Sequence, residues 1–257
     1  MLLLAGGVCP SEQPPRDANA FVRGLVGGQR RSEEALSRFA YDVTEVRERL
    51  DKQGRAQRKE IRVFEVFYVK GRPIRRLVAR NNRELGERDR EREERRVREL
   101  AEAVREGRAV TEQPGMRLSR ILERYDFSSR GAELIEGRCS LVFDFAARAD
   151  DLELERDKLL RKLSGSLWVD EAEHAVARLE VRNTSGLRFA FGLGASISTL
   201  SFHMAFTYME EGVWLPLRLE AYAEGRRFLF RRFRSRRTTT YSNYRRFEVD
   251  VQEDIQP

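Results

Sequence analysis

Apolar and polar residues alternate with a period of two along most of this chain. The clearest example is 199–208, where Leu200, Phe202 and Met204 begin an apolar set separated by small or polar residues. Such alternation predicts strands that bury one face. The expected strands are 39–50, 61–69, 74–80, 139–145, 167–170, 177–182, 187–191, 199–208, 214–220, 228–233 and 245–251. Most of them are separated by short turns, so consecutive strands are expected to pair as antiparallel neighbours.

A few segments follow the period of a helix instead. Residues 84–108 are almost wholly Glu and Arg, but Val97, Leu100 and Val104 lie on one narrow apolar stripe. Glu and Arg four residues apart support such a helix, and its mixed charge is typical of a solvated face rather than of a nucleic-acid binder. A second helix is expected at 118–125, and a short one within 11–29.

Together these elements predict an α+β fold built on about ten strands. A sheet of this size rarely stays flat, because each strand adds twist. We therefore expect a strongly curved antiparallel sheet, an open half-barrel, with a few helices covering its concave side. The expected domain covers residues 17–257 and includes a charged helical insert at 84–126. Residues 1–16 are expected to be a signal-peptide remnant or a disordered leader.

An open half-barrel has a concavity that its own side chains need not fill. An apolar hollow of this kind would suit an acyl chain. The alternative is that its aromatic residues simply form the core of the domain. The residues expected to line the ligand cavity are Phe143, Phe145, Trp168, Phe189, Phe191, Phe202, Met204, Phe206 and Tyr208.

Charge adds a second candidate surface. The 257 residues include 49 Lys and Arg against 42 Asp and Glu, a formal net charge of +7. The excess is local, because the segment 225–246 contains many arginines and no acid. Such a patch favours an anionic partner, while the alternative is an edge hairpin whose charges prevent aggregation. The expected anionic-surface patch consists of Arg226, Arg227, Arg231, Arg232, Arg234, Arg236 and Arg237.

The beginning of the chain bears on its compartment. An apolar run, then small residues and a Pro-containing stretch, resemble the end of a secretory signal. Gly6 and Val8 do not match a lipobox before Cys9, so removal or lipidation of Cys9 stays open. Two thiols, Cys9 and Cys139, cannot form a disulfide framework and lack metal-ligand spacing. We expect an exported, periplasmic protein, with membrane association as a further option.

The sequence contains no constellation typical of catalysis. Only His174 and His203 are present, and neither has a cysteine or carboxylate at ligand spacing. The glycines at 192–194 lack the spacing of phosphate-binding loops, and no Gly-x-Ser-x-Gly motif occurs. We therefore expect a protein that is not an enzyme and uses no cofactor and no metal.

Several motifs carry a family resemblance. They are Phe-Glu-Val-Phe-Tyr-Val-Lys-Gly-Arg-Pro at 64–73 with its continuation at 75–81, Gly-Ser-Leu-Trp-Val-Asp at 165–170, Gly-Val-Trp-Leu-Pro at 212–216, and Tyr-Ser-Asn-Tyr-Arg-Arg-Phe at 241–247. With the order of elements, they resemble the outer-membrane lipoprotein carriers of the LolA/LolB type and the related periplasmic sensor RseB, over roughly residues 38–251. The resemblance implies an unclosed barrel that wraps around helices and holds a lipid or an acylated chain. No functional residue of the carriers can be placed on this sequence.

The sequence thus predicts a non-catalytic exported binding protein that holds a lipid, acyl chain or lipoprotein in an apolar half-barrel cavity. Its arginine-rich hairpin is expected to meet an anionic membrane surface. The alternative is an envelope sensor or interaction module that docks another envelope protein through the sheet edge or the charged helix. Nucleic-acid binding through 226–246, with Tyr241 and Tyr244 stacking on bases, is the weakest hypothesis.

Overall fold

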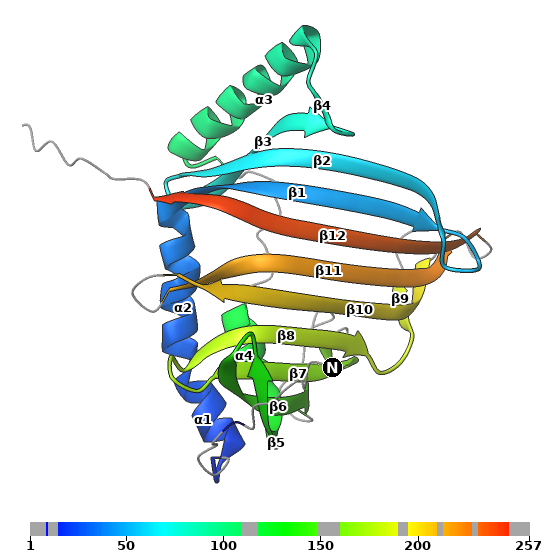
Figure 1. The fold of residues 1–257 in the computed structure, drawn as a ribbon. Helices are drawn as coiled ribbons and strands as arrows, with labels where there is room; N and C mark the ends of the chain where they lie inside the picture. Colours follow the sequence, from blue (N-terminus) through cyan, green and yellow to red (C-terminus); the bar gives the residue numbers. More distant parts are fainter. Residues whose placement is uncertain are drawn as a thin grey trace, which may run out of the picture.

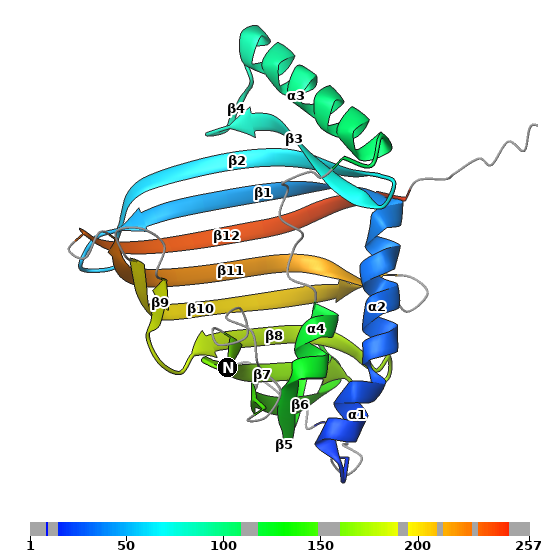
Figure 2. The ribbon, with the colours of Figure 1, turned by 180° about the vertical axis from the view of Figure 1, so that it is seen from behind.

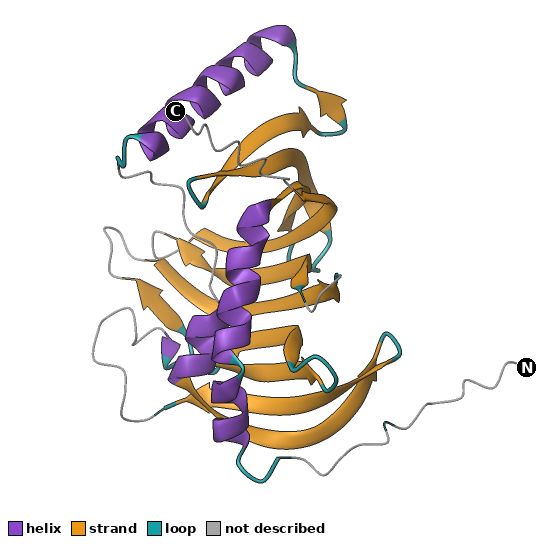
Figure 3. Cartoon of the chain, turned by 90° about the vertical axis from the view of Figure 1, so that its left-hand side faces the viewer, coloured by secondary structure: helices purple, strands orange, loops and turns teal. Residues whose placement is uncertain are grey.

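The fold is one large antiparallel sheet with helices at one end and along one edge. The computed structural model describes residue 9 and residues 15–108, 118–148, 160–189, 195–209, 213–227 and 231–246. Among them, 12 strands form a single sheet in the order β4-β3-β2-β1-β12-β11-β10-β8-β7-β6-β5, with β9 paired to β10. The sheet curves and its outer strands do not meet (Figures 1 and 3). The expected curved, open antiparallel sheet with helices is confirmed.

The bounds of the elements are as follows. The strands are β1 (Phe39–Leu50), β2 (Ala56–Val69), β3 (Arg72–Arg80), β4 (Arg83–Glu84), β5 (Tyr125–Ile135), β6 (Arg138–Ala147), β7 (Leu163–Asp170), β8 (Ala175–Asn183), β9 (Leu187–Phe189), β10 (Ala195–Tyr208), β11 (Trp214–Arg227) and β12 (Arg231–Arg246). The helices are α1 (Ala18–Gly24), α2 (Val26–Ala35), the 3-10 helix η1 (Leu36–Arg38), α3 (Glu87–Arg105) and α4 (Leu118–Arg124).

Two strands differ from the sequence expectation. β5 begins at Tyr125, directly after α4, where we expected a break lasting to Gly131. β12 is one long strand, where two separate strands at 228–233 and 245–251 were expected. Residues 228–230 and 247–251 lie outside the described residues. β12 pairs with β1 on one side and with β11 on the other. Because backbone hydrogen bonds on both sides hold it in place, β12 is a strand although its polar sequence does not predict one.

The sheet consists of two meanders joined by its first and last long strands. Neighbouring strands are consecutive in sequence except where β1 pairs with β12 and where β10 pairs with β8. In the first of these pairs Val43 lies opposite Tyr241 and Glu45 lies opposite Thr239. This long-range ladder places residues from both ends of the chain side by side in the middle of the sheet.

The main core lies between the helices α1 and α4 and the strands β5 to β8. Phe143, Leu167 and Leu179 are fully buried in it, together with Leu122 of α4. The ring of Phe21 in α1 stacks on Phe143, with 5.5 Å between the ring centroids. We call the face of the sheet that carries this core the inner face. Figure 2 shows α4 lying across β7 and β8 on this face, while α2 runs along the ends of the strands.

The charged helix α3 covers an edge of the sheet and does not enter the core. It lies along β3, the strand next to the short terminal strand β4 (Figure 1). The carboxylate of Glu93 accepts a hydrogen bond from the backbone N–H of Leu77 at 2.7 Å, and Arg96 donates to the carbonyl of Arg75. Side chains of α3 therefore satisfy backbone groups that an open edge strand would offer to another chain.

Two glycines allow close approach between neighbouring strands. A Cβ on Gly165 would lie 1.8 Å from the carbonyl oxygen of Glu180, and one on Gly225 would lie 2.1 Å from that of Ser196. Gly165 pairs with Phe145 and Gly225 pairs with Phe233. A phenylalanine beside a strand glycine covers the exposed backbone, which is a common arrangement where a sheet bends.

A disulfide ties the start of the chain to the sheet. Cys9 and Cys139 of β6 are bonded, with their Cα atoms 5.5 Å apart across a sequence separation of 130 residues. The sequence analysis assigned no structural role to this pair, because two cysteines at such a distance carry no spacing signal.

Candidate functional site

Among the described residues, the inner face is less covered in the middle of the sheet than at its two ends. Over β7 and β8 the inner residues Val169, Val176 and Leu179 are at most 1% exposed. Along β11, in contrast, Pro216 to Glu224 are half-exposed on both faces, apart from the exposed Arg218. The main contacts of the described helices are with β5 and β8 at one end and with β2 and β3 at the other. Within the described residues, the inner face of β11 is therefore less covered than the two ends of the sheet, and we call it the open floor. Val43 and Glu45 of β1 and Thr239 of β12, which share this face, are buried.

The aromatic residues predicted to line a cavity divide into several groups. Phe143, Phe145 and Phe206 are buried in the main core, whereas Phe202 and Met204 are half-buried at its margin, next to the open floor. Tyr208 is 40% exposed. The side chain of Phe189 and the whole of Phe191 lie outside the described residues.

Trp168 lies on the face opposite the core. Its neighbours Leu167 and Val169 belong to the main core, so Trp168 points the other way. There its indole donates to Glu133 at 2.9 Å and is flanked by the guanidinium groups of Arg130 and Arg178. This packing makes Trp168 a structural residue of the outer face.

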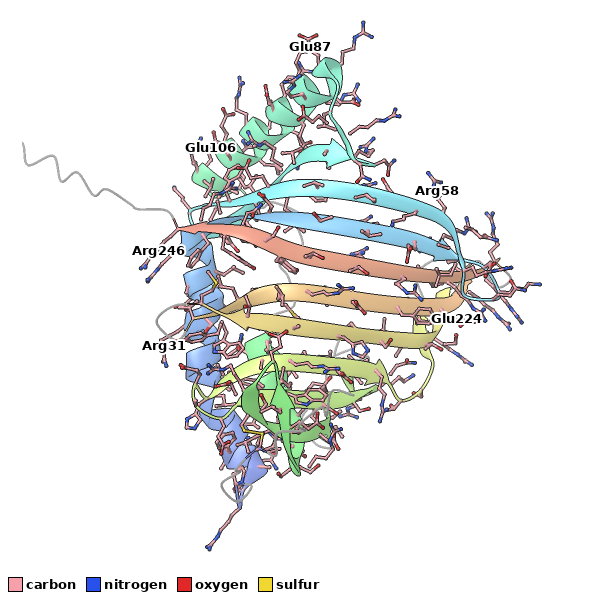
Figure 4. All side chains as sticks on the ribbon, in the orientation of Figure 1. Arg31, Arg58, Glu87, Glu106, Glu224 and Arg246 are labelled. Carbon is pink, nitrogen blue, oxygen red and sulfur yellow. A yellow bond between two sulfur atoms is a disulfide. The ribbon has the colours of Figure 1, made fainter. Side chains whose placement is uncertain are left out.

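A groove runs beside α2 at the ends of the strands. One part of about 910 Å³ lies between the two N-terminal helices and the start of β8, and a second part of about 600 Å³ reaches Phe39 and Tyr244. Both parts are lined by Ala35, Arg38 and Val213, so the groove is continuous. Figure 4 shows Arg31 and Arg246 at this end of the molecule, where each lines one part of the groove. Pockets of this size accommodate small organic ligands.

Aromatic rings connect the groove with the open floor. Tyr41, Tyr68, Tyr241 and Tyr244, the tyrosine cluster, pack together, and Phe39 meets Tyr244 edge-on with ring centroids 6.1 Å apart. The Tyr41 and Tyr244 centroids are 5.1 Å apart. Burial, followed by the neighbouring phenols, raises the pKa of Tyr41 and that of Tyr244 far above their usual range, so both stay neutral. The cluster is thus an uncharged, amphipathic surface.

A buried carboxylate follows the tyrosine cluster along β1. Glu45 is 4% exposed and accepts hydrogen bonds from Arg75 at 2.5 Å and from Arg47 at 2.8 Å. Burial alone would raise the pKa of Glu45, but the bonds from Arg75 and then Arg47 outweigh it and hold the pKa below its ordinary value. Arg75 also stacks on the ring of Phe64 at 4.1 Å. The inner face therefore changes from aromatic to charged within a few residues of one strand.

The arginines of the predicted anionic-surface patch do not form one surface. Arg234 and Arg236 pair with Glu224 and Glu48, and Arg227 lies over the ring of Phe233. Arg226 and Arg232 line a separate cleft of about 450 Å³ at the hairpin end, and Arg231 is exposed beside it. Arg237 has the opposite strand parity to Arg236 and faces the inner side.

The histidines occupy separate places in the structure. His174 lies in the turn before β8, where its ring meets that of Phe21 edge-on. The Nδ1 atom of His203 on β10 is 3.3 Å from a carboxylate oxygen of Glu180. Within the described ranges, no three His, Cys, Asp or Glu side chains are grouped closely enough to hold a metal ion. In the same part of the chain, no helix combines the length and apolar character needed to cross a membrane.

The tyrosine cluster and Glu45 were missed by the sequence analysis, although part of the signal is visible. Phe39, Tyr41 and Val43 alternate with the smaller or polar residues Ala40 and Asp42, and the same parity continues into Glu45 and Arg47. A strand face that changes from aromatic to charged halfway along its length indicates a border between an apolar surface and a charged one. Only the pairing with β12 brings Tyr241 and Tyr244 to it.

Comparisons with known proteins give similarities to solved structures alone. No family model and no curated protein matches the chain. Among solved structures it is similar to a domain assigned as an outer membrane lipoprotein-sorting protein from Vibrio parahaemolyticus, with 9% identity over 90% of this chain and 94% of that chain and a TM-score of 0.41. It is also similar to a DUF1329 family protein from Desulfovibrio piger (12% identity, 92% and 95% coverage, TM-score 0.36).

A third similar structure is the MucA/MucB complex of Pseudomonas aeruginosa (10% identity, 88% and 99% coverage, TM-score 0.26). Structures of the lipoprotein-carrier and envelope-sensor kind, which the sequence motifs resemble, are thus also among the similar solved structures. At TM-scores below 0.5 these similarities say what the chain looks like and not what it binds.

Proposed function

We propose that this chain is a non-catalytic, exported binding protein that holds a lipid, an acyl chain or an acylated protein on the inner face of its open sheet. The observation that carries the proposal is the α2 groove, which reaches Phe39 and Tyr244, together with the half-exposed strand β11, whose Pro216 carbonyl accepts a hydrogen bond from the Tyr244 hydroxyl. A groove that is largely apolar and bordered by uncharged phenols suits an acyl chain better than a strongly hydrated ligand.

The disulfide supports the exported location. Disulfide bonds persist in oxidising compartments such as the periplasm and are rare in the cytosol. The bond between Cys9 and Cys139 also restricts processing, since any signal cleavage that preserves it must occur before Cys9.

The test uses one strand with two faces. Leu200 packs at the margin of the main core on the inner face, and Ser201 follows it on the outer face. Leu200→Lys should strongly reduce the lipid that co-purifies with the full chain, measured by native mass spectrometry and lipid extraction. Ser201→Lys, the matched control, should leave it unchanged. Thermal melting of both variants checks that they fold. A wild-type chain that carries no lipid and takes up none from detergent-solubilised membranes would refute the proposal.

A second candidate function, docking of another envelope protein, is favoured by the β5 edge. At the start of this edge the side-chain oxygen of Asn19 in α1 accepts a hydrogen bond from the Phe127 N–H, whereas Leu134 near the hairpin is 46% exposed. A photo-crosslinking residue at Leu134 should then capture a partner in cells, while one at Val78, exposed on the α3-covered strand β3, should not. Equal labelling at both positions, or none, would reject this candidate.

A further inference from the structure

The inner face beyond the tyrosine cluster carries unequal numbers of positive and negative side chains. Arg47, Arg62, Arg75 and Arg237 share this face with Glu45 and Glu60, and we call these six residues the inner cationic cluster. Glu45 lies opposite Arg62 on β2, and Arg47 lies opposite Glu60 on β2 and Arg237 on β12. Four guanidinium groups against two carboxylates leave an excess of two positive charges.

The two carboxylates are already occupied. Glu45 accepts from Arg75 and Arg47, and Glu60 accepts from Arg62 at 2.7 Å. The Nε atom of Arg75 is buried without a hydrogen-bond partner. A buried charged donor without an acceptor is costly, because it has lost its hydration and gained no partner.

Arg237 is the clearest unsatisfied group of the cluster. Among the described residues it makes no hydrogen bond and no ion pair, although its side chain is exposed to the inner side. Burial, then the charges of Arg47 and Arg75, lower its pKa, and Glu45 offsets this only in part. Five N–H donors of one guanidinium group therefore face a region of positive potential.

The strand register places this cluster beside the apolar part of the floor. A row of paired residues crosses the sheet from Val181 to Phe202, Ala221, Arg237 and Arg47. Along this row the side chains change from buried apolar, to half-buried aromatic, to small, and then to cationic. With strands about 4.8 Å apart, Phe202 and Arg237 lie roughly 10 Å from each other. A molecule lying across the row would meet apolar surface at one end and guanidinium groups at the other.

We propose that the inner cationic cluster binds the phosphate head group of an anionic phospholipid whose acyl part lies on the neighbouring apolar surface. The inference rests on the proposed function and adds the ligand class to it. The planar fork of Arg237 matches two phosphate oxygens at once, and charge complementarity distinguishes this ligand from neutral or zwitterionic lipids. Arg47 and Arg75, fixed by Glu45, supply the surrounding positive potential.

The experiment measures binding of short-chain lipids to the full chain by isothermal titration calorimetry. Dihexanoyl phosphatidylglycerol, below its micelle concentration, is compared with dihexanoyl phosphatidylcholine and with inorganic phosphate. Arg237→Gln should weaken phosphatidylglycerol binding about tenfold, the loss expected for one charge-assisted bidentate contact. Arg237→Lys should recover part of it, because the charge remains. Arg236→Gln, the next residue but paired with Glu48 on the outer face, is the matched control and should bind as the wild type does.

The outcomes separate the two proposals. If neither lipid binds the wild-type chain, the proposed function fails. If both lipids bind equally and Arg237→Gln changes neither, the function stands and the head-group site is refuted. The site is also refuted if Arg236→Gln weakens binding as much as Arg237→Gln, or if inorganic phosphate alone binds as tightly as the phospholipid. A loss with Arg38→Gln but not with Arg237→Gln would place the head group at the α2 groove instead.

Discussion

Among the described glycines, Gly165 leaves the least room for a Cβ, and this predicts a strong effect of adding one methyl group. In Gly165→Ala the new Cβ would lie 1.8 Å from the carbonyl oxygen of Glu180 and 2.8 Å from the ring of Phe145. Contacts shorter than 3.0 Å are essentially never seen for a real Cβ, so the oxygen and the Cβ must separate by more than about 1 Å. The obstacle is the backbone of β8, which cannot rotate away as a flexible side chain can.

The expected loss of stability is about 3 kcal/mol, at the upper end of the range for overpacked cores, because the shift strains the hydrogen-bond ladder between β7 and β8. For a domain of this size, that lowers the melting temperature by roughly 6–12 °C. Urea denaturation and thermal melting followed by circular dichroism both measure it. Gly186→Ala is the matched control, since its Cβ would be 3.8 Å from the nearest atom, the carbonyl oxygen of Ile197, an ordinary contact.

The control should change the free energy of unfolding by less than about 0.5 kcal/mol. If Gly165→Ala is as stable as Gly186→Ala, the close approach of β7 and β8 at this point is wrong. The curvature that depends on it would then be wrong as well.

Three further predictions concern buried charges and the disulfide. Asp170 is 1% exposed and accepts two hydrogen bonds from Arg138. Asp170→Ala should therefore lower the free energy of unfolding, measured by urea denaturation, by about 3 kcal/mol. A change below about 0.5 kcal/mol would contradict the pairing. Cys139→Ser removes the disulfide that spans 130 residues and should lower the free energy of unfolding by up to about 5 kcal/mol. Reduction of the wild type should have the same effect. If the variant melts at the same temperature as the unreduced wild type, Cys9 is not bonded to Cys139. Hydrogen bonds from arginines outweigh burial and hold the pKa values of Glu45 and Asp170 below their ordinary 4.5 and 3.8. The resulting stabilisation is complete above about pH 5 and is lost as the pH falls below these ordinary values and through the lowered pKa values of the folded chain. An unfolding free energy that stays constant from pH 6 to 3 would contradict this.

The sequence predicts most of the local structure because alternation is a local property. Phe39–Leu50 was predicted with the bounds that the structure gives to β1, and the charged helix was predicted within a few residues of α3. The polar strand β12 was predicted only in part, since Arg, Ser and Thr dominate its middle and only pairing on both sides makes it a strand. β5 is absent from the expected strands, because Asp126 and two serines at its start read as a helix end.

The candidate site was less predictable than the fold, because it depends on pairs that are distant in sequence. Trp168 and Phe143 give equal apolar signals, yet they lie on opposite faces, one in an arginine sandwich and the other in the core. Arg236 and Arg237 are neighbours of the same type, but strand parity and the β1 register separate them into an outer ion pair and an inner unpaired cation. Composition cannot distinguish such residues, whereas register does.

The central claim is that the inner face between the covered ends of the sheet binds an acyl chain. A phosphatidylglycerol analogue with a photoreactive group in its acyl chain tests this directly, with the crosslinked peptides of the full chain mapped by mass spectrometry. We expect crosslinks to Phe39 and Tyr244 at the groove and to Leu200 and Phe202 on β10. Crosslinks confined to the outer face around Trp168, or the absence of crosslinks to the folded chain, would contradict the account.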